Sequence, residues 1–305
     1  MPQNRLTINH SHFQNLELLA RQVVEGFIIG LHKSPFHGFS VEFAEHRLYN
    51  QGDPLRHIDW RVYGRTDRLF VKRFEEETNL RCCIAIDTSS SMHFPKKEDK
   101  VNKLQFSALA AVCILQLLKK QLDAATLALF DEDIGFMSPC RSSNTHYRLL
   151  TNELEKLLQH KPTGKKTNAA KALHQIAEQM HKRSLIVVFS DMMDDAEHVD
   201  ALFSALQHLR YNKHEVILFH TIEGKLESEF EFENRPYEFV DMETGEKIKL
   251  QPQQIREQYT SEMKNFQQLI ENRCHQYNID RIPVNLSQPV EQVLHSFLIK
   301  RNKLL

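Results

Sequence analysis

The stretch R-C-C-I-A-I-D-T-S-S-S-M, residues 81–92, decides the fold, because it joins an apolar run to a polar loop. The run 84–86 predicts a short buried strand. Asp87, Ser89 and Ser91 follow with the spacing D-x-S-x-S, which lets one loop turn a carboxylate and two hydroxyls toward one point. Hard divalent cations such as Mg²⁺ prefer oxygen ligands of this kind. The alternative is an Asp-Ser turn that binds nothing, since both residues are common turn formers.

Further oxygen ligands appear later in the chain. Residues 185–189 form a second continuous apolar run, which is typical of a central parallel strand, and Ser190 and Asp191 follow it directly. Between the two strands, the loop 163–170 carries Thr167 and opens into a helix. Strand, D-x-S-x-S, loop threonine, strand and aspartate therefore occur in that order, and we expect their side chains to converge.

This order resembles the metal-ion-dependent adhesion site of von Willebrand factor type A domains, and all three segments of that site are present. The resemblance implies that Ser89, Ser91 and Thr167 supply hydroxyls. It also implies that Asp87 and Asp191 hold the ion directly or through water. The implied ion is Mg²⁺, with Mn²⁺ and Ca²⁺ as other possible occupants.

Strands and helices alternate along the rest of the chain, which predicts an α/β fold with a doubly wound, mostly parallel sheet flanked by helices, a type A-like and Rossmann-like topology. In such sheets ligands bind beyond the carboxyl ends of the strands, where the strand order reverses. We expect an N-terminal extension over 1–79, a type A-like domain over 80–305 and a β-hairpin excursion near 229–251. Helices are predicted over 13–31, 101–121, 147–160, 168–182, 197–210, 251–276 and 289–301. Further strands are predicted over 69–74, 125–130, 134–137, 215–220 and 279–284.

The composition excludes several classes of protein. With 41% hydrophobic and 26% charged residues, the chain has the balance of an ordinary globular protein. The formal net charge of −1 gives no general attraction to nucleic acid. Five cysteines without C-x-x-C spacing favour a reducing compartment. The N-terminus has no apolar signal core, and no run is apolar enough to span a membrane, so we expect a cytoplasmic protein.

Residues 42–60 carry a second informative string, E-F-x-E-x-R-x-Y-x-x-G-D-x-x-R-x-I-D-W, which precedes the strand of the metal loop. Together with that loop it resembles the bacterial "domain of unknown function fifty-eight" family. Members of that family are commonly encoded beside MoxR-type AAA+ ATPases, so the resemblance implies such an ATPase as a partner. The dense pairing of charges around one tryptophan predicts a recognition surface made of Glu45, Arg47, Asp53, Arg56, Asp59 and Trp60.

Two functions are compatible with these residues. The favoured one is a metal-dependent protein-binding module, with no catalytic residue assigned, in which the ion accepts an acidic side chain from the ATPase or from a client protein. The assembly would then remodel or mature other proteins in a chaperone-like way. The alternative is a Mg²⁺- or Mn²⁺-dependent hydrolase of phosphoester bonds, in which the ion and an aspartate activate water. ATP binding at 159–167 is rejected, because the loop lacks the glycine and hydroxyl positions of a phosphate loop.

Overall fold

The structure is a computed structural model that describes residues 15–32, 46–48, 60–72, 80–96, 100–159, 168–193, 199–242 and 244–302. Its contacts divide the chain into two units. One consists of Met1–Phe27 with Leu80–Leu305, and the other is Ile28–Asn79. The smaller unit contains strand β1 (His46–Leu48), which pairs antiparallel with β2 (Phe70–Lys72), and helix α2 (Trp60–Thr66). Of these, β2 lies within the predicted strand over 69–74, whereas β1 was not predicted.

The larger unit is built on a six-stranded sheet of order β10-β7-β6-β3-β4-β5. β5 is antiparallel to β4, and the other neighbours are parallel. Counted along the chain from the β5 edge, the order is 3-2-1-4-5-6, the doubly wound arrangement, with its reversal between β3 and β6. This confirms the predicted α/β fold. The strands are β3 (Arg81–Asp87), β4 (Ala124–Phe130), β5 (Ile134–Met137), β6 (Leu185–Ser190), β7 (Glu215–Ile222) and β10 (Asp280–Asn285).

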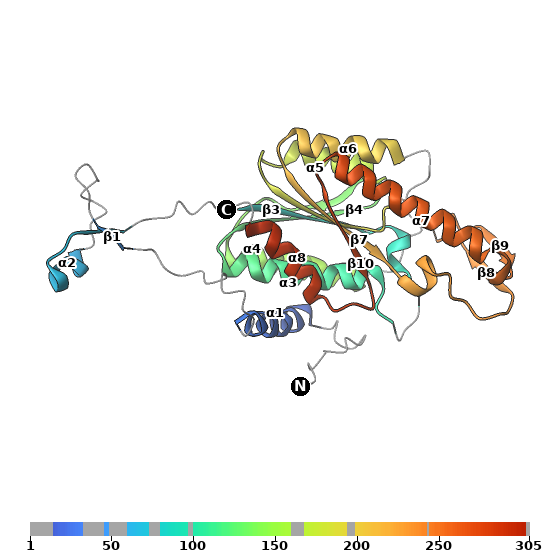
Figure 1. The fold of residues 1–305 in the computed structure, drawn as a ribbon, viewed down its shortest axis with the longest axis horizontal. Coiled ribbons are helices and arrows are strands. Elements are labelled where there is room, and N and C mark those ends of the chain that lie inside the picture. Colours follow the sequence, from blue (N-terminus) through green and yellow to red (C-terminus); the bar gives the residue numbers. More distant parts are fainter. Residues whose placement is uncertain are drawn as a thin grey trace. The chain divides into compact units, whose positions relative to one another are not determined.

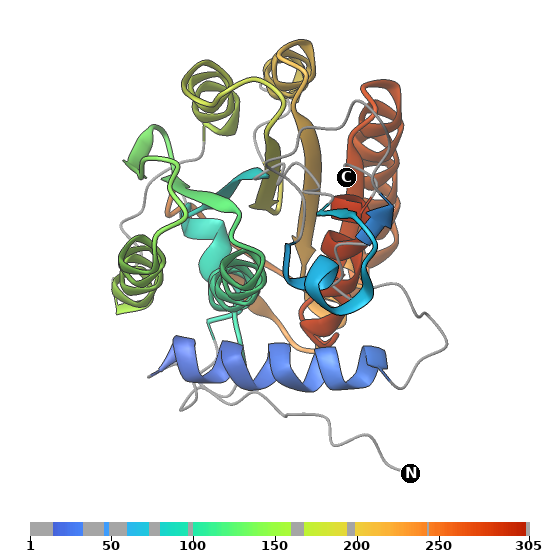
Figure 2. The same cartoon turned by 90° about the vertical axis from the view of Figure 1, so that its left-hand side faces the viewer.

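Helices cover both faces of this sheet (Figures 1 and 2). One face carries α5 (Ala169–Gln179) and α6 (Val199–Tyr211), and the other carries α3 (Lys103–Lys120), α4 (Asn144–Gln159) and α8 (Glu291–Asn302). α7 (Pro252–Gln276) is the longest described helix, with 25 residues, and it packs beside β10. Within the described ranges, no helix combines the length and the apolar character needed to cross a membrane.

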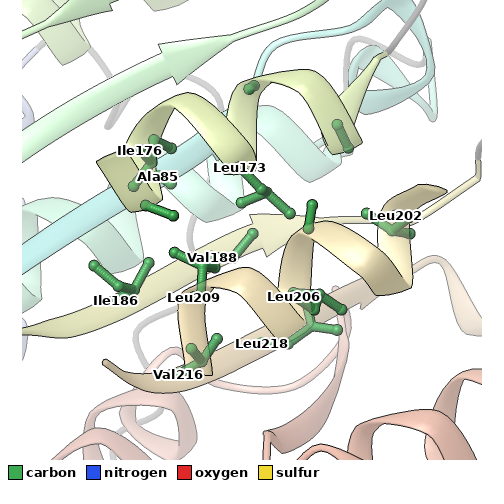
Figure 3. Close-up of a cluster of buried hydrophobic side chains, with 14 of the residues drawn as sticks. Ala85, Leu173, Ile176, Ile186, Val188, Leu202, Leu206, Leu209, Val216 and Leu218 are labelled. Atoms are coloured by element: carbon green, nitrogen blue, oxygen red, sulfur yellow. The ribbon is translucent and has the colours of Figure 1, made fainter. Parts of the chain in front are cut away.

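The core between the sheet and α5 and α6 shows why these sequences fold as they do (Figure 3). In α5, buried residues recur at helical spacing and form one apolar stripe. Asn168 caps this helix, because its side chain accepts a hydrogen bond from the Lys171 N–H at 3.0 Å. The stripe packs against fully buried strand residues such as Ala85 and Val188. Burying each large aliphatic side chain contributes about 1.5–3 kcal/mol.

Helix α3 is buried almost all round, because α1 (Leu16–His32) covers the side of it that faces away from the sheet. The Sγ atom of Cys113 lies 4.0 Å from the Ala20 carbonyl oxygen, a contact between the two helices. A capping box fixes the start of α3: the Asn102 side chain accepts from the Gln105 N–H at 2.8 Å, and the Gln105 side chain accepts from the Asn102 N–H at 3.1 Å. The box sets the position of Lys103, the first residue of the helix.

An insertion follows β7 and confirms the predicted hairpin. It begins with a one-turn π-helix, η4 (Gly224–Ser228), and continues into the antiparallel strands β8 (Tyr237–Val240) and β9 (Lys247–Leu250). The turn between them contains Gly245 with a φ of 75°, a left-handed conformation that glycine adopts without strain. Stacked aromatic rings, including Phe230 against Phe239, join the hairpin to the start of α7. The insertion and α7 lie together at one end of the unit (Figure 1).

Candidate functional site at the carboxyl edge of the sheet

The candidate site lies where β3 and β6 end, at the reversal of strand order. The two strands are parallel neighbours, and Ile86 pairs with Phe189 in their register. Asp87 and Ser190 are therefore the last residues of adjacent strands, and Asp191 follows at the same edge. Apolar strands that end in polar residues carry these side chains to the place where doubly wound sheets bind ligands.

Both oxygens of the buried Asp87 carboxylate accept hydrogen bonds. The Ser89 N–H donates to Oδ1 at 2.9 Å, and the Ser190 hydroxyl donates to Oδ2 at 2.8 Å. The first bond tightens the loop after β3, and the second ties β3 to β6. Ser190 therefore belongs to the site. From the sequence it was predicted only to flank the strand, beside Asp191.

The two predicted serine hydroxyls also meet. A short 3-10 helix, η3 (Ser90–His93), turns the loop so that the Ser89 and Ser91 Oγ atoms lie 3.0 Å apart. Interaction with the Ser91 side chain also helps to lower the pKa of Asp191. The structure thus brings together Asp87, Ser89, Ser91 and Asp191.

Thr167, the fifth predicted ligand, lies outside the described residues. The next residue, Asn168, donates its N–H to the Asp131 carbonyl at 3.0 Å, just beyond the carboxyl end of β4. The described chain therefore resumes at the same edge of the sheet, one strand away from Asp87.

A buried ion-pair network adjoins these residues and was not predicted from the sequence. The Lys103 ammonium lies 2.7 Å from Asp191 Oδ2 and 2.6 Å from Glu227 Oε1. Glu227 also accepts from the Glu223 N–H through Oε2, at 2.8 Å. The network links α3, the end of β6 and the π-helix η4. In the sequence, Lys103 itself could have indicated this network. A lysine in the first turn of a buried helix opposes the helix dipole and needs anionic partners.

The charges of the site are set by burial and by this network. Burial, with the nearby Asp191 carboxylate, raises the pKa of Asp87 to about 7. Burial also opposes ionisation of Asp191, but the Lys103 ammonium outweighs it and lowers the pKa of Asp191. Burial raises the pKa of Glu227 even though Lys103 is adjacent. Asp191 and Lys103 therefore form the ionised pair, and Asp87 is the carboxylate whose ionisation is least favourable.

His220 of β7 fixes the backbone of Asp191 through a hydrogen bond. Its Nδ1 atom accepts from Arg281, with the Nη2 atom at 2.9 Å, so Nε2 carries the proton and donates to the Asp191 carbonyl at 2.8 Å. Burial and the positive charge of Arg281 lower the pKa of His220 to about 4. A neutral imidazole thus holds the backbone at the end of β6.

The oxygen-bearing groups gathered here fit Mg²⁺, and they include more hydroxyls than carboxylates that lack a cationic partner. No cluster of three or more His, Cys, Asp or Glu side chains able to hold a metal occurs in the part of the chain that the structure describes. Asp87 with the Ser89 and Ser91 hydroxyls would supply oxygen ligands to such an ion, and the raised pKa of Asp87 marks a carboxylate that would gain from a nearby cation. Asp191 already faces the Lys103 ammonium, which suits it to a role beside these ligands.

The predicted recognition surface falls mostly beyond what the structure describes. Arg47 lies in β1 and Trp60 begins α2, both in the smaller unit. Glu45, Asp53, Arg56 and Asp59 lie outside the described residues. Their role in recognition stays a prediction.

Comparison with solved structures finds similar chains of low identity. The conserved hypothetical protein BatB from Bacteroides thetaiotaomicron is 14% identical, covers 73% of this chain and 99% of its own, and gives a TM-score of 0.43. An aerotolerance-related membrane protein from Bacteroides fragilis is 17% identical, covers 72% of this chain and 99% of its own, and gives a TM-score of 0.44. We assign the fold from the strand order and register.

Comparison by sequence identifies the family. An uncharacterised protein of Mycobacterium bovis and one of Mycobacterium tuberculosis are each 26% identical over 180 residues, which is 59% of this chain. The chain spans 56% of the length of these relatives. The model of the family described as "Protein of unknown function DUF58" matches residues 45–268, more than half of the chain. This protein belongs to the DUF58 family.

Proposed function

We propose that this protein is a metal-dependent protein-binding module whose contact point is the carboxyl edge between β3 and β6. The observation that carries the proposal is the convergence of the Asp87 carboxylate with the Ser89 and Ser91 hydroxyls at the reversal of strand order. Ligands in doubly wound sheets bind at this place. The hydroxyl-rich donor set supports a weakly held, hydrated Mg²⁺.

A bound Mg²⁺ supplies a coordination position that an acidic side chain of a partner can fill. The chain's own residues keep that position attractive to an anion. Lys103 offsets part of the charge of the Asp191 carboxylate, 2.7 Å away, and Ser89 and Ser91 would contribute ligands without charge. The site therefore carries little negative charge of its own to repel an acidic group.

The proposed partner is a MoxR-type AAA+ ATPase, a client protein of that ATPase, or both, acting in chaperone-like remodelling or maturation of other proteins. The ATPase is proposed from the family resemblance, and the metal edge provides chemistry that suits an acidic contact. The segment containing Arg56 and Trp60 is the second proposed contact. The cytoplasmic location stays a prediction.

We further propose that the site binds without turnover. A general base needs a carboxylate that is available to take a proton from water. Asp87 is proposed as a ligand of the ion, and Asp191 is paired with a buried ammonium, so neither is left to take that proton. Assays with phosphodiester and phosphomonoester substrates in Mg²⁺ or Mn²⁺ test this directly, and Asp87-dependent turnover would establish the hydrolase alternative.

Calorimetric titration with a MoxR-type AAA+ ATPase from the same organism tests the proposed function. We expect binding in Mg²⁺ that weakens roughly tenfold or more in chelator or in Asp87→Ala. Asp200→Ala is the matched control, because Asp200 is an exposed aspartate on α6, and it should bind as the wild type does. Equal affinity for wild type and Asp87→Ala would remove the metal edge from recognition.

A further inference from the structure

A groove with a volume of about 510 Å³ opens beside the candidate site, between the metal loop and the insertion. Ser91 and Glu227 line it on the side of the site, and Met242, just beyond β8, and Met263 of α7 line it on the other side. This volume is in the range of pockets that bind ligands. We propose that the groove binds a segment of the partner protein in which a lysine or arginine stands next to large apolar side chains. This inference deepens the proposed function and rests on it for the premise that this edge meets a partner.

The walls of the groove are apolar and only partly buried. Three methionines and three aromatic residues contribute to them, and each keeps part of its surface exposed. Methionine is flexible and polarisable, so such walls adapt to apolar side chains of different shape. These residues are Phe94, Met193, Met242, Tyr259, Met263 and Phe266.

The charge of the groove favours a partner segment that carries positive charge. Its titratable acids are Glu227, Asp241 and Glu262, and none of its described lining residues is basic. Glu227 is neutralised in part by Lys103, at 2.6 Å. Asp241 and Glu262 line the groove and are exposed, so they attract a cation and repel an acidic segment. A groove lined by apolar side chains and exposed acids is complementary to apolar anchors flanked by Lys or Arg.

This partner chemistry is compatible with an acidic contact at the metal. Ser91 belongs to both surfaces, since it lines the groove and its hydroxyl lies 3.0 Å from that of Ser89. One partner segment can therefore place an acidic side chain at the metal loop and its basic and apolar side chains in the groove. The two contacts can be separated by substitution, because Asp241 and Glu262 lie in the insertion and in α7.

Two synthetic peptides test the proposal. Both carry leucine at i, i+3, i+4 and i+7. In one the remaining positions are lysine, and in its twin they are glutamate. We expect fluorescence anisotropy at physiological ionic strength to show at least roughly tenfold tighter binding of the lysine peptide to the full chain. Equal affinities, or tighter binding of the glutamate peptide, would overturn the proposal.

Charge reversal locates the binding. Asp241→Lys with Glu262→Lys should weaken the lysine peptide by roughly tenfold. The control is Glu132→Lys with Glu178→Lys, which makes the same change in net charge at exposed positions outside the groove, and it should alter affinity by less than about threefold. Equal loss in both pairs would show non-specific attraction and contradict the proposal.

Apolar substitution tests the walls and guards against misfolding. Met263→Gln keeps the length of the side chain and should still weaken the lysine peptide several-fold. If the reversal pair fails to fold by circular dichroism, Asp241→Asn with Glu262→Gln replaces it, with the same direction expected. Binding unaffected by Met263→Gln and by the charge changes would exclude the groove. If analytical ultracentrifugation shows a dimer of the wild type that Met263→Gln converts to a monomer, the groove would instead be assigned to a second copy of this chain.

The metal is tested separately from the groove. The lysine peptide has no acidic side chain, so its binding should stay within about threefold in chelator and in Asp87→Ala. If Mg²⁺ binding fails while the lysine peptide keeps its selectivity, the groove stands and the metal-dependent function falls. If Mg²⁺ binds and the peptides are not distinguished, only the groove is excluded.

Discussion

The middle of β6 and its carboxyl end are equally buried, yet opposite interactions stabilise them. Val188 packs among aliphatic side chains of α5 and α6, where burial alone is favourable (Figure 3). A few residues later, Asp191 is buried with a carboxylate that needs the Lys103 ammonium. The comparison teaches that a buried position at the edge depends on specific partners, whereas one in the core depends mainly on shape and volume.

The largest effect is expected from Lys103→Ala. Removing the ammonium leaves Asp191 and Glu227 as buried acids without their cation, which should lower the free energy of unfolding by about 3–5 kcal/mol. Urea denaturation measures it. Asp191→Asn combined with Lys103→Met removes both charges and should cost less than Lys103→Ala alone. A loss below about 1 kcal/mol in Lys103→Ala would contradict the assigned network.

A core substitution sharpens the comparison. Leu206 of α6 is almost fully buried in the cluster of Figure 3, so Leu206→Ala should cost about 2–5 kcal/mol through lost burial and the cavity that remains. The loss should be the same at pH 7.5 and pH 5, because no titratable group is involved. A loss that changes with pH would show that this core is coupled to the charges of the edge.

The edge should instead respond to pH through His220. Its pKa in the folded protein is about 4, below the ordinary value of 6.5, so the unfolded chain binds the proton more readily. The contribution to stability is complete above pH 6.5 and is lost as the pH falls toward 4, which amounts to on the order of 2 kcal/mol at pH 5. The difference in unfolding free energy between wild type and His220→Gln, followed from pH 7.5 to pH 5, isolates it. A constant difference would exclude this protonation.

The smallest effect is expected from Asp87→Ala in the absence of metal. The substitution leaves the Ser89 N–H and the Ser190 hydroxyl without an acceptor, but it also removes a buried carboxylate that Asp191 repels. The two contributions oppose each other, so the change should stay within about 1 kcal/mol. Asp87→Asn, which keeps an acceptor, should be at least as stable. Unfolding of Asp87→Ala would make Asp87 a structural residue.

The same contrast explains what could be predicted from the sequence. The apolar runs of β3 and β6 and the spacing of α5 predict the strands, the helix and the fold, because local periodicity reflects the face that is buried. Asp87, Ser89, Ser91 and Asp191 were predicted together from their order after two apolar runs and from the resemblance to the type A metal site, which places the two strands side by side. The boundaries of these elements differ by at most three residues, as for α3, predicted over 101–121 and observed as Lys103–Lys120.

The ion-pair network could not be predicted in this way. Lys103 is 88 residues from Asp191 and 124 residues from Glu227, and no local pattern pairs charges that tertiary packing brings together. The π-helix that carries Glu227 has no sequence signature of its own. Such distant partners follow only from the fold, which explains why the hydroxyl ligands were predicted and the charges that set their environment were not.

Direct titration of Mg²⁺ into the metal-free protein, followed by calorimetry, tests whether the carboxyl edge between β3 and β6 binds a metal ion. Asp87→Ala and Ser89→Ala are the test variants, and Asp200→Ala is the control. If Asp87 and Ser89 hold a Mg²⁺ ion, we expect one saturable site in wild type and in Asp200→Ala, loss of that site in Asp87→Ala, and weaker binding in Ser89→Ala. Binding that is equal in wild type and Asp87→Ala, or no binding in the folded wild type, would contradict it.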